Sequence, residues 1–440
     1  EIAVIGGGPA GSFFSYFVLG QARRVGLDIR VDICEPRRFD ESGPSGCNHC
    51  GGIISESLVQ ILAAEGINIP PSVVQRGIDS YMLHTDVGST RIDTPLVEKR
   101  IAAVFRGAGP SGLGESSWSS FDAYLLKLAV SRGAQVLRKL VSGVEFKAGR
   151  PHLRSPDGWN KDYDLVVVAT GVTSNFFQLI ENLEIGYRPP RTVKTFICEF
   201  QLGRETIQTH MGTSMHVFLL DIPGLEFAAV IPKGDYATMC LLGHDIDNQM
   251  VEAFLASPEV KGCFPNPEKI PERVCFCFPR INVQSAVQPF ADRMVLVGDC
   301  GVARLYKDGI GAAYRTSKAA AKTAVLHGIA KEDFEQHYWP ACHAIAKDNR
   351  IGKLIFAVNH RFQGMRFSQR AVLRMTSWEQ QKKEGPQFMS TVLWDLFTGS
   401  APYREILQRM FHPSFWIPFA WNLVAAVFSR GGDKKIGRSL

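Results

Sequence analysis

The sequence predicts an α/β fold in which a parallel sheet is built from segments far apart in the chain. Three short apolar runs, at residues 2–5, 164–168 and 294–297, each lead into a glycine-containing turn. Short runs of valine, isoleucine and leucine are typical of strands buried on both faces, as in parallel sheets. The 440 residues are 45% hydrophobic and 21% charged, which is a globular composition and excludes a disordered or fibrous chain.

The first run is followed by a glycine-rich turn and then by a helix pattern at residues 12–19. Gly6 permits the tight turn, Gly8 lets the backbone approach a diphosphate, and Gly11 lets the helix pack against the strand. A diphosphate bound here lies at the helix N-terminus, where free N–H groups and the helix dipole favour negative charge. The residues expected to contact it are Gly6, Gly8, Pro9, Ala10 and Gly11.

A second strand, at residues 29–34, ends in a carboxylate. Glu35 lies 24 residues after Gly11, close to the ~20 residues typical of an acid that accepts hydrogen bonds from a ribose. Pro36 and Arg37 continue this turn and are expected to contact the same ligand. Strand, glycines, helix, strand and acid in this order predict a Rossmann-type dinucleotide-binding domain. A glycine-rich turn that binds nothing is the alternative.

Two distant segments favour FAD over NAD as the dinucleotide. The strand at 164–168 ends in a turn of small residues, and the strand at 294–297 is followed by an acid and then by a glycine pair that opens a helix. The acid can bind a ribityl chain, and the helix N-terminus can receive the electron-rich end of an isoalloxazine. The residues expected there are Thr170, Gly171, Gly298, Asp299, Gly309, Ile310, Gly311 and Ala312.

This three-part pattern resembles the glutathione-reductase-type FAD flavoproteins. The helix and strand patterns at 121–129 and 133–136 are similar to the p-hydroxybenzoate hydroxylase branch of that superfamily. The resemblance covers about the first 345 residues. It implies non-covalent FAD in a discontinuous Rossmann-type domain.

Within that branch, Cys50, Gly51 and Gly52, together with the loop at 308–313, resemble the geranylgeranyl reductase family. Its members are FAD enzymes that hydrogenate isolated double bonds of prenyl chains. The resemblance implies that Gly51 and Gly52 face the flavin and that Cys50 is the candidate catalytic residue, donating a proton while flavin N5 transfers a hydride. One position departs from the family, which usually has an arginine where this chain has Trp118.

A second Gly-x-Gly-x-x-Gly pattern, at residues 107–112, is interpreted as a loop beside the flavin or the substrate. The helix pattern begins only at Phe121, nine residues after Gly112, so these glycines do not open a helix. Arg132, rather than an acid, lies about 20 residues further on. With no second nucleotide domain, we expect either a transiently docked NAD(P)H or a protein to supply the electrons.

The remaining chain divides by its hydrophobic pattern. Alternation of apolar and polar residues at 195–200, 216–220 and 227–231 predicts a sheet with one covered and one open face. Its apolar side chains would suit a long hydrocarbon ligand, and an ordinary sheet core is the alternative. The expected domains are FAD-binding at 1–65, 98–185 and 272–345, a substrate-binding β-sheet domain at 66–97 and 186–271, and a helical C-terminal region at 346–440.

The cysteines and histidines do not predict a metal site. Cys47 and Cys50 have the spacing of a redox dithiol or half a zinc site, and Cys275-x-Cys277 is the nearest second pair, on an expected strand. The eleven histidines are scattered and are interpreted as structural or surface residues. Ten cysteines in 440 residues are too few for a disulfide scaffold. A cytoplasmic protein is expected, since the chain opens with a strand and not with a signal peptide.

Positive charge is concentrated near the C-terminus. Residues 347–374 contain seven basic and one acidic side chain, and residues 430–440 contain four and one. The apolar stretch at 415–428 is too short to span a bilayer core, which needs ~20 residues. We expect this region to bind a membrane surface, and a helix docked on the FAD domain or on a partner subunit is the alternative. The net charge of +6 gives no reason to expect nucleic acid.

Three functions remain open at this stage. The resemblance favours an FAD-dependent reductase of prenyl-type lipids, with an apolar lipid as substrate. The basic, aromatic C-terminus suits equally well a flavoprotein that relays electrons from a soluble donor, such as a partner protein, to a membrane quinone. An FAD-dependent aromatic monooxygenase is the third. Those enzymes usually have an Asp-Gly pair after the middle strand, where this chain has Ala169, Thr170 and Gly171.

Overall fold

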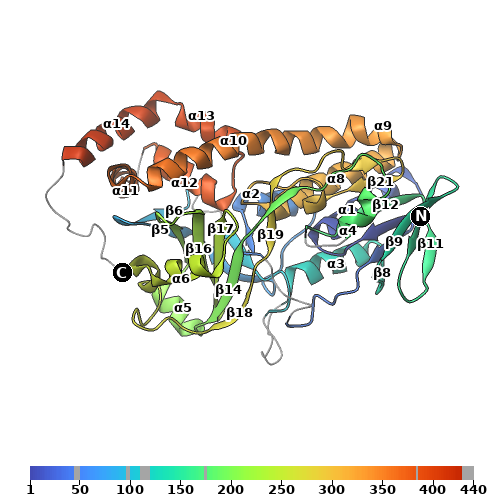
Figure 1. The fold of residues 1–440 in the computed structure, drawn as a ribbon, viewed down its shortest axis with the longest axis horizontal. Helices are drawn as coiled ribbons and strands as arrows, with labels where there is room; N and C mark the ends of the chain where they lie inside the picture. Colours follow the sequence, from blue (N-terminus) through green and yellow to red (C-terminus); the bar gives the residue numbers. More distant parts are fainter. Residues whose placement is uncertain (44–49, 96–99, 110–118, 173–175, 383–384, 429–440) are drawn as a thin grey trace. The chain divides into compact units, whose positions relative to one another are not determined.

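The computed structural model describes residues 1–43, 50–95, 100–109, 119–172, 176–382 and 385–428 (Figure 1). They form two compact units. The first unit comprises Glu1–Asn48, Arg106–Thr192 and Arg280–Lys347, and the second comprises His49–Phe105, Val193–Pro279 and Asp348–Leu440. Of the described residues expected in the FAD-binding domain, 50–65, 100–105 and 272–279 group with the second unit, as do residues 348–382 and 385–428 of the expected C-terminal region. Residues 186–192, expected in the substrate-binding domain, group with the first unit.

The first unit is built on a six-stranded sheet with the order β20-β21-β12-β1-β2-β8. The pairs from β21 to β8 are parallel and only β20 is antiparallel. Residues in β1, β2 and β12 are all buried, as expected for strands with helices on both faces. The strands are β1 (Ile2–Ile5), β2 (Val31–Cys34), β8 (Gln135–Leu137), β12 (Leu165–Val168), β20 (Phe290–Ala291) and β21 (Met294–Leu296).

Two helices that begin at glycine turns pack against each other in this unit. In α1 (Pro9–Val25), Phe13 makes an edge contact with Tyr314 of α8 (Gly309–Leu326) at 5.8 Å between ring centres. Ser317 donates a hydrogen bond to the backbone oxygen of Ala10 at 2.8 Å. The other helices are α3 (Phe121–Ser131), α4 (Phe176–Glu181), η2 (Gly298–Cys300), α9 (Lys331–Asp333) and η3 (Phe334–Tyr338), with the small sheet β9 (Gly143–Lys147), β10 (Arg150–Arg154) and β11 (Asn160–Asp162).

The second unit is built on a seven-stranded sheet with the order β18-β14-β17-β16-β15-β5-β6. Only the β15–β5 pair is parallel. The strands are β5 (Ser80–Thr85), β6 (Gly88–Asp93), β14 (Phe196–Gln201), β15 (Ser214–Leu219), β16 (Leu225–Lys233), β17 (Tyr236–Gly243) and β18 (Arg273–Cys277). A smaller sheet of this unit contains β3 (Ile53–Ile54), β4 (Val74–Ile78) and β7 (Ile101–Val104), next to α2 (Glu56–Ala64). The remaining strands, β13 (Arg191–Lys194) and β19 (Arg280–Gln284), pair as a two-stranded sheet, and β19 belongs to the first unit.

The expectation that one face of the large sheet is open is wrong. Every residue of β15, β16 and nearly all of β14 is buried, on both faces. One face packs with α5 (Arg204–His210), α6 (Asn248–Ala256) and α7 (Pro258–Lys261). On the other, Tyr81 of β5 stacks on Trp394, and Phe227 of β16 contacts Phe397, both in α12 (Phe388–Thr398).

The apolar side chains of this sheet form an ordinary core, which was the stated alternative to a hydrocarbon site. Phe196, Phe200, Phe218 and Met239 lie together in one buried cluster with α6 and are fully inaccessible to solvent. Leu219 and Phe227 are buried as well, with 6% of each surface exposed. The alternation of apolar and polar residues led to a wrong prediction, because the C-terminal helices cover the face of the sheet that was expected to meet solvent.

The C-terminal helices therefore form part of the second unit. They are α10 (Trp339–Gln363), which begins in the first unit, α11 (Arg366–Gln381), α12, α13 (Tyr403–Met410) and α14 (Pro413–Phe428). Thr90 of β6 and Ser377 of α11 share a hydrogen bond of 2.9 Å. Among the described residues, no helix has both the length and the apolar character that crossing a bilayer requires.

Candidate functional site

The glycine-rich turn after β1 has the close backbone contacts that its motif predicts. A side-chain carbon at Gly11 would lie 1.9 Å from the backbone oxygen of Gly6, so only glycine lets α1 begin this close to the strand. Gly6 has a φ of 105°, and a carbon there would lie 2.5 Å from the oxygen of Ala169. Gly8 is the N-cap of α1, and no side chain caps the helix. The first N–H groups of α1 are therefore available to an anion.

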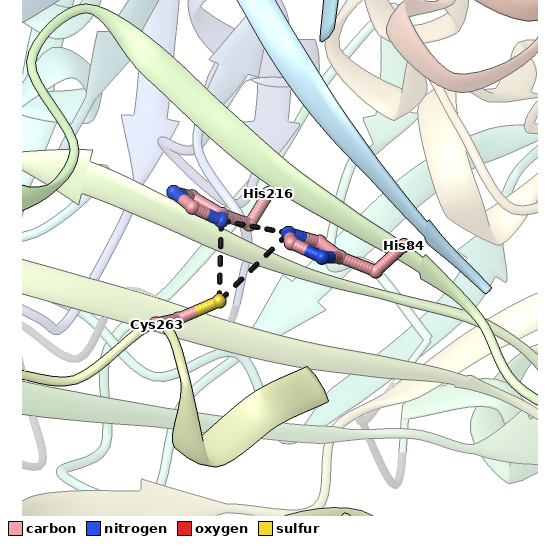
Figure 2. A group of neighbouring side chains, drawn as sticks. All are labelled: His84, His216 and Cys263. Carbon is pink, nitrogen blue, oxygen red and sulfur yellow. Dashed lines mark hydrogen bonds between the residues drawn. The ribbon is translucent and has the colours of Figure 1, made fainter. Parts of the chain in front are cut away.

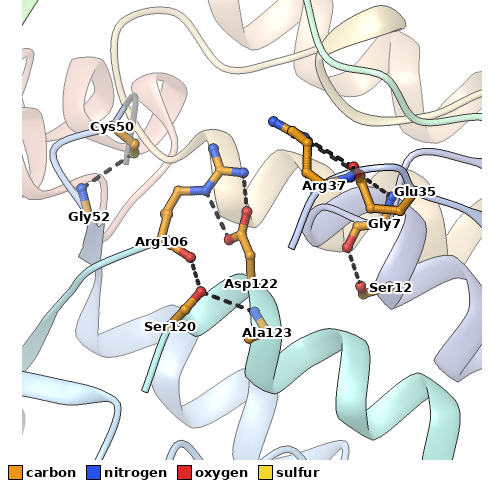
Figure 3. Close-up of polar contacts among 10 residues, drawn as sticks. All are labelled: Gly7, Ser12, Glu35, Arg37, Cys50, Gly52, Arg106, Ser120, Asp122 and Ala123. Atoms are coloured by element: carbon orange, nitrogen blue, oxygen red, sulfur yellow. Dashed lines mark hydrogen bonds and ion pairs between the residues drawn. The ribbon is translucent and has the colours of Figure 1, made fainter. Parts of the chain in front are cut away.

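An ion pair lies beside this helix N-terminus. Arg106 and Asp122 form a bidentate pair, with Nε–Oδ1 at 3.0 Å and Nη2–Oδ2 at 2.7 Å (Figure 3). A side-chain carbon on Gly8 would lie 3.7 Å from Arg106 Nη2 and 3.9 Å from Asp122 Oδ2. Asp122 belongs to the first turn of α3, which Ser120 caps by accepting a hydrogen bond from the N–H of Ala123. Arg106 thus places a guanidinium next to the expected diphosphate position.

Glu35 follows β2 and its side chain is buried, 2% exposed. Its carboxylate accepts hydrogen bonds from the N–H of Gly7 at 2.9 Å, the N–H of Arg37 at 2.9 Å and the Arg37 guanidinium at 3.0 and 3.3 Å (Figure 3). These four contacts use the lone pairs that a carboxylate offers. The Arg37 side chain is 50% exposed, so a ribose hydroxyl can reach Glu35 by replacing this guanidinium.

Substitution of Glu35 by alanine is therefore expected to weaken FAD binding. Loss of charge-assisted hydrogen bonds of ~1.5–3 kcal/mol corresponds to roughly a 10- to 150-fold higher Kd. Titration of the apoprotein with FAD, followed by flavin fluorescence, measures this. Glu41→Ala is the matched control, because Glu41 is an exposed acid on the same connection that pairs only with Arg38 among the described residues. An unchanged affinity in Glu35→Ala would show that the ribose is held elsewhere.

The turns after β12 and β21 carry further polar groups to which no described residue donates a hydrogen bond. The Oγ1 of Thr170 is buried and has no hydrogen-bond partner among the described residues. Asn282 donates to the backbone oxygen of Asp299 at 2.7 Å, and no described residue donates to the Asp299 carboxylate. Burial raises the pKa of Asp299, and the charge of Arg106 opposes this rise. A carboxylate in this state can accept hydrogen bonds from the hydroxyls of a ribityl chain.

The N-terminus of α8 has an acidic cap that is paired with two arginines. Asp308, in a left-handed conformation with φ 52°, accepts a hydrogen bond from the N–H of Gly311 at 3.1 Å. Its Oδ2 also pairs with Arg304 at 2.9 Å and Arg315 at 3.0 Å. The two guanidinium groups hold Asp308 at the cap, and the helix dipole places positive charge at the N–H groups of this first turn. Sequence reasoning missed both arginines, since neither lies in a motif.

These features fit an FAD molecule. The N-terminus of α1 with Arg106 suits the diphosphate, Glu35 suits the adenosine ribose, and Asp299 suits the ribityl chain. The positive N-terminus of α8 suits the electron-rich end of an isoalloxazine. All of the predicted cofactor residues except Gly51 and Gly52 belong to the first unit.

The Cys50-Gly51-Gly52 loop belongs to the second unit and is tightly held there. A side-chain carbon at Gly52, where φ is 66°, would lie 1.9 Å from the backbone oxygen of Val104, and one at Gly51 would lie 3.2 Å from the sulfur of Cys240. Cys50 is half-buried, and its Sγ accepts a hydrogen bond from the N–H of Gly52 at 3.3 Å (Figure 3). The loop thus excludes a side chain at Gly52, leaves little room for one at Gly51 and keeps Cys50 half-buried.

A lysine that the sequence did not single out lies behind this loop. Lys233, at the end of β16, is completely buried, and its Nζ has no hydrogen-bond partner in the part of the chain that the structure describes. The Nζ lies 5.0 Å from the ring centre of Phe105 and 2.8 Å from the point that a side-chain carbon of Gly52 would occupy. Burial raises the pKa of Cys240, while the charge of Lys233 lowers it and that of Cys50 raises it. The charges of Lys233 and Cys50 therefore both influence the pKa of the same thiol, that of Cys240.

Two histidines and a cysteine also meet in the second unit (Figure 2). His84 Nε2 lies 2.9 Å from His216 Nδ1, and Cys263 Sγ lies 3.1 Å from the same His216 atom and 3.8 Å from His84 Nε2. Burial lowers the pKa of His84 to about 3 and that of His216 to about 4, so both rings are neutral at pH 7. Residues 84, 216 and 263 are far apart in the chain, so their spacing did not predict that they meet.

The rings of His84 and His216 are arranged as hydrogen-bond partners and not as ligands of one metal ion. The ring planes differ by 7° and the ring centres are 5.1 Å apart, nearly the greatest separation that the 2.9 Å contact between the two nitrogens allows. Each nitrogen therefore points directly at the other, whereas coordination of one ion requires both lone pairs to converge on a point beside the sulfur. His84 Nδ1 also bonds to Ser89 Oγ at 2.7 Å. We assign this group to the core.

Several predicted residues lie outside the described part of the chain: Cys47, Gly112 and Trp118. Gly107 and Gly109 are described and lie outside the helices and strands, whereas residues 110–112 of the second glycine pattern lie outside the described residues. The next described helix, α3, begins at Phe121. Cys275 and Cys277 lie on β18, as expected, and both are half-buried.

Comparisons with known proteins rest on structure, since no protein-family model and no curated sequence matches this chain. A geranylgeranyl bacteriochlorophyll reductase-like protein from Thermoplasma acidophilum aligns with a TM-score of 0.65 at 16% identity, over 93% of this chain and 98% of that one. A flavoprotein/dehydrogenase from Cytophaga hutchinsonii aligns with a TM-score of 0.62 at 14% identity, over 97% and 98%. The halogenase PltM, in complex with phloroglucinol and FAD, aligns with a TM-score of 0.60 at 11% identity, over 98% and 92%. The predicted fold is thereby confirmed: this chain has the fold of FAD-binding flavoproteins.

Proposed function

We propose that the protein is an FAD-dependent oxidoreductase, and more specifically a reductase of carbon–carbon double bonds in prenyl-type lipids. The fold and the polar groups of the first unit support the cofactor. The Cys50-Gly51-Gly52 loop supports the reaction, since it combines a half-buried cysteine with a buried cation. Reduced FAD, when bound, supplies the hydride for such a reaction, with NAD(P)H or a protein as its electron source.

The chain's own contribution to this reaction is a proton. An isolated double bond that accepts a hydride on one carbon needs a proton on the other, and Cys50 is the proposed donor. Its thiol must be protonated at rest, and the resulting thiolate needs stabilisation after transfer. The N–H of Gly52 already donates to Sγ, and the ammonium of Lys233 lies 2.8 Å from the point that a side-chain carbon of Gly52 would occupy. Both groups favour a negative sulfur.

The proposed reaction is tested with a panel of prenyl lipids. The full chain is loaded with FAD, reduced anaerobically with dithionite and mixed with each lipid in detergent. The expected result is oxidation of the flavin together with a lipid product heavier by two hydrogens, measured by mass spectrometry. Rapid reduction of a quinone with no alkene product would support the electron-relay function instead. Oxygen consumption coupled to hydroxylation would support a monooxygenase.

Substitution of Cys50 by serine is expected to lower the rate of alkene reduction roughly 100-fold or more, because a hydroxyl is a weaker acid than a thiol and a positioned proton donor contributes typically ~10²–10⁴-fold. The absorbance spectrum of bound FAD and its Kd should stay unchanged, since the hydrogen bond at Sγ is made within the loop. Cys275→Ser is the matched control, because Cys275 is another half-buried cysteine of the same unit. Full turnover in Cys50→Ser would rule out the thiol as donor and leave the fold and cofactor unaffected.

A further inference from the structure

The last described helix, α14, is apolar on both of its sides. It contains no charged residue between Pro413 and Phe428. Phe415 and Phe419 are 3% and 4% exposed and face the rest of the unit, where Phe419 contacts Phe362 of α10 at 6.0 Å between ring centres. Helix α14 also packs along α11. This side of the helix is occupied by the protein's own core.

The opposite side of α14 is exposed to solvent. Trp416, Ile417, Trp421 and Val424 are 45%, 72%, 75% and 51% exposed. At 100° per residue, these four positions fall within an arc of about 140°, and Phe415 and Phe419 fall outside it. A surface helix normally presents polar residues to water, and a helix that is apolar all round is normally buried. The exposed side of α14 therefore requires a covering partner.

Charge identifies the kind of partner. The chain continues after α14 with four basic and one acidic residue among positions 430–440. Basic side chains are also exposed on α10 and α11, at Lys353, Arg361, Arg366 and Arg374. Half of the large hydrophobic side chains that are exposed in the described part of the chain lie after residue 347. Apolar and aromatic side chains among Lys and Arg match the interface of an anionic bilayer.

We propose that α14 is a membrane-docking helix that inserts Trp416, Ile417, Trp421 and Val424 into the interface of an anionic lipid bilayer while Phe415 and Phe419 keep it attached to the second unit. The helix lies in the plane of the interface, because its inner side stays packed on α11. At the headgroup level, the apolar rings of Trp416 and Trp421 can contact the acyl chains while their indole N–H groups form hydrogen bonds. This inference does not depend on the proposed reaction.

The experiment uses point substitutions, since a truncation before α14 would also remove the packed residues Phe415 and Phe419. The double variant Ile417→Glu, Trp421→Glu changes only the exposed side. Full-length wild type is expected to co-sediment with vesicles of phosphatidylcholine and phosphatidylglycerol, and the variant to bind them at least about tenfold more weakly. Binding to vesicles of phosphatidylcholine alone should be weaker, and salt should reduce the difference between the two compositions.

The matched control is Val130→Glu, Leu140→Glu, which places the same two charges on exposed apolar positions of the first unit. It should bind anionic vesicles as wild type does. Melting temperatures of all variants confirm folding. The proposal is wrong if wild type does not bind anionic vesicles, or if the α14 variant binds them as tightly as wild type. A wild-type dimer that becomes monomeric in the α14 variant, without any vesicle binding, would show that a second copy covers this side.

Discussion

Substitution of Gly8 by alanine is expected to remove most FAD binding while leaving the protein folded. A side-chain carbon at Gly8 meets no atom closer than 3.7 Å, and its φ of −66° suits any residue. The folded chain therefore accepts alanine. The added methyl group would stand between the diphosphate and the first N–H groups of α1. Loss of about two charge-assisted hydrogen bonds, at ~1.5–3 kcal/mol each, corresponds to an FAD Kd at least about 100-fold higher.

The contrast with a neighbouring glycine makes this result specific. Gly11→Ala places a carbon 1.9 Å from the oxygen of Gly6, so this variant should lose stability as well as FAD. Gly77→Ala is a neutral control, because a carbon there meets only the flexible side chain of Arg100. Kd from flavin fluorescence and melting temperature of the apoprotein are measured for all three. If Gly8→Ala binds FAD as tightly as wild type, the diphosphate does not lie at the N-terminus of α1.

Substitution of Lys233 by methionine is expected to lower alkene reduction by about 100-fold or more without destabilising the protein. Burial of an unpaired charge is unfavourable, and replacement of a buried charged group by an apolar one of similar shape is often neutral or stabilising by ~1–4 kcal/mol. The melting temperature should therefore stay the same or rise. The rate should fall, because the thiolate formed at Cys50 loses its nearby cation, and groups that assist proton transfer contribute typically ~10²–10⁴-fold.

This combination of effects distinguishes a functional lysine from a structural one. Lys269→Met, at an exposed position of the same unit, is the control and should change neither property. FAD affinity should be unchanged in Lys233→Met, since Lys233 belongs to the second unit and the residues assigned to FAD by their contacts belong to the first. A Lys233→Met protein that is less stable yet fully active would show that the ammonium supports the fold and not the reaction.

The dinucleotide-binding half of the protein could be predicted from the sequence because its information is local. The apolar run at 2–5, the three glycines and Glu35 specify a strand, a turn, a helix and an acid within 35 residues. A position that only glycine can occupy, through its positive φ at Gly6 or through close packing at Gly11, is recognisable in the sequence. The fold class followed from three such segments, and the structural comparisons confirm it.

The remainder depended on contacts between residues that are distant in sequence. The guanidinium of Arg106 next to Gly8, the two arginines at Asp308 and the cation close to Gly52 stand at positions that no motif singles out. The large sheet was misjudged for the same reason. Alternation reports which side chains suit an apolar face, but whether the other face meets water depends on helices α11 and α12, which lie more than 100 residues further along the chain.

Residues 415–428 show this division within a single helix. The sequence by itself determined that the helix is apolar, uncharged and too short to span a bilayer. Only the tertiary structure decided which side chains remain available, because Phe415 and Phe419 are used in packing while Trp416, Ile417 and Trp421 are not. The apolar composition of this helix can be read from the sequence. The exposure of each of its side chains depends on which other residues pack against it.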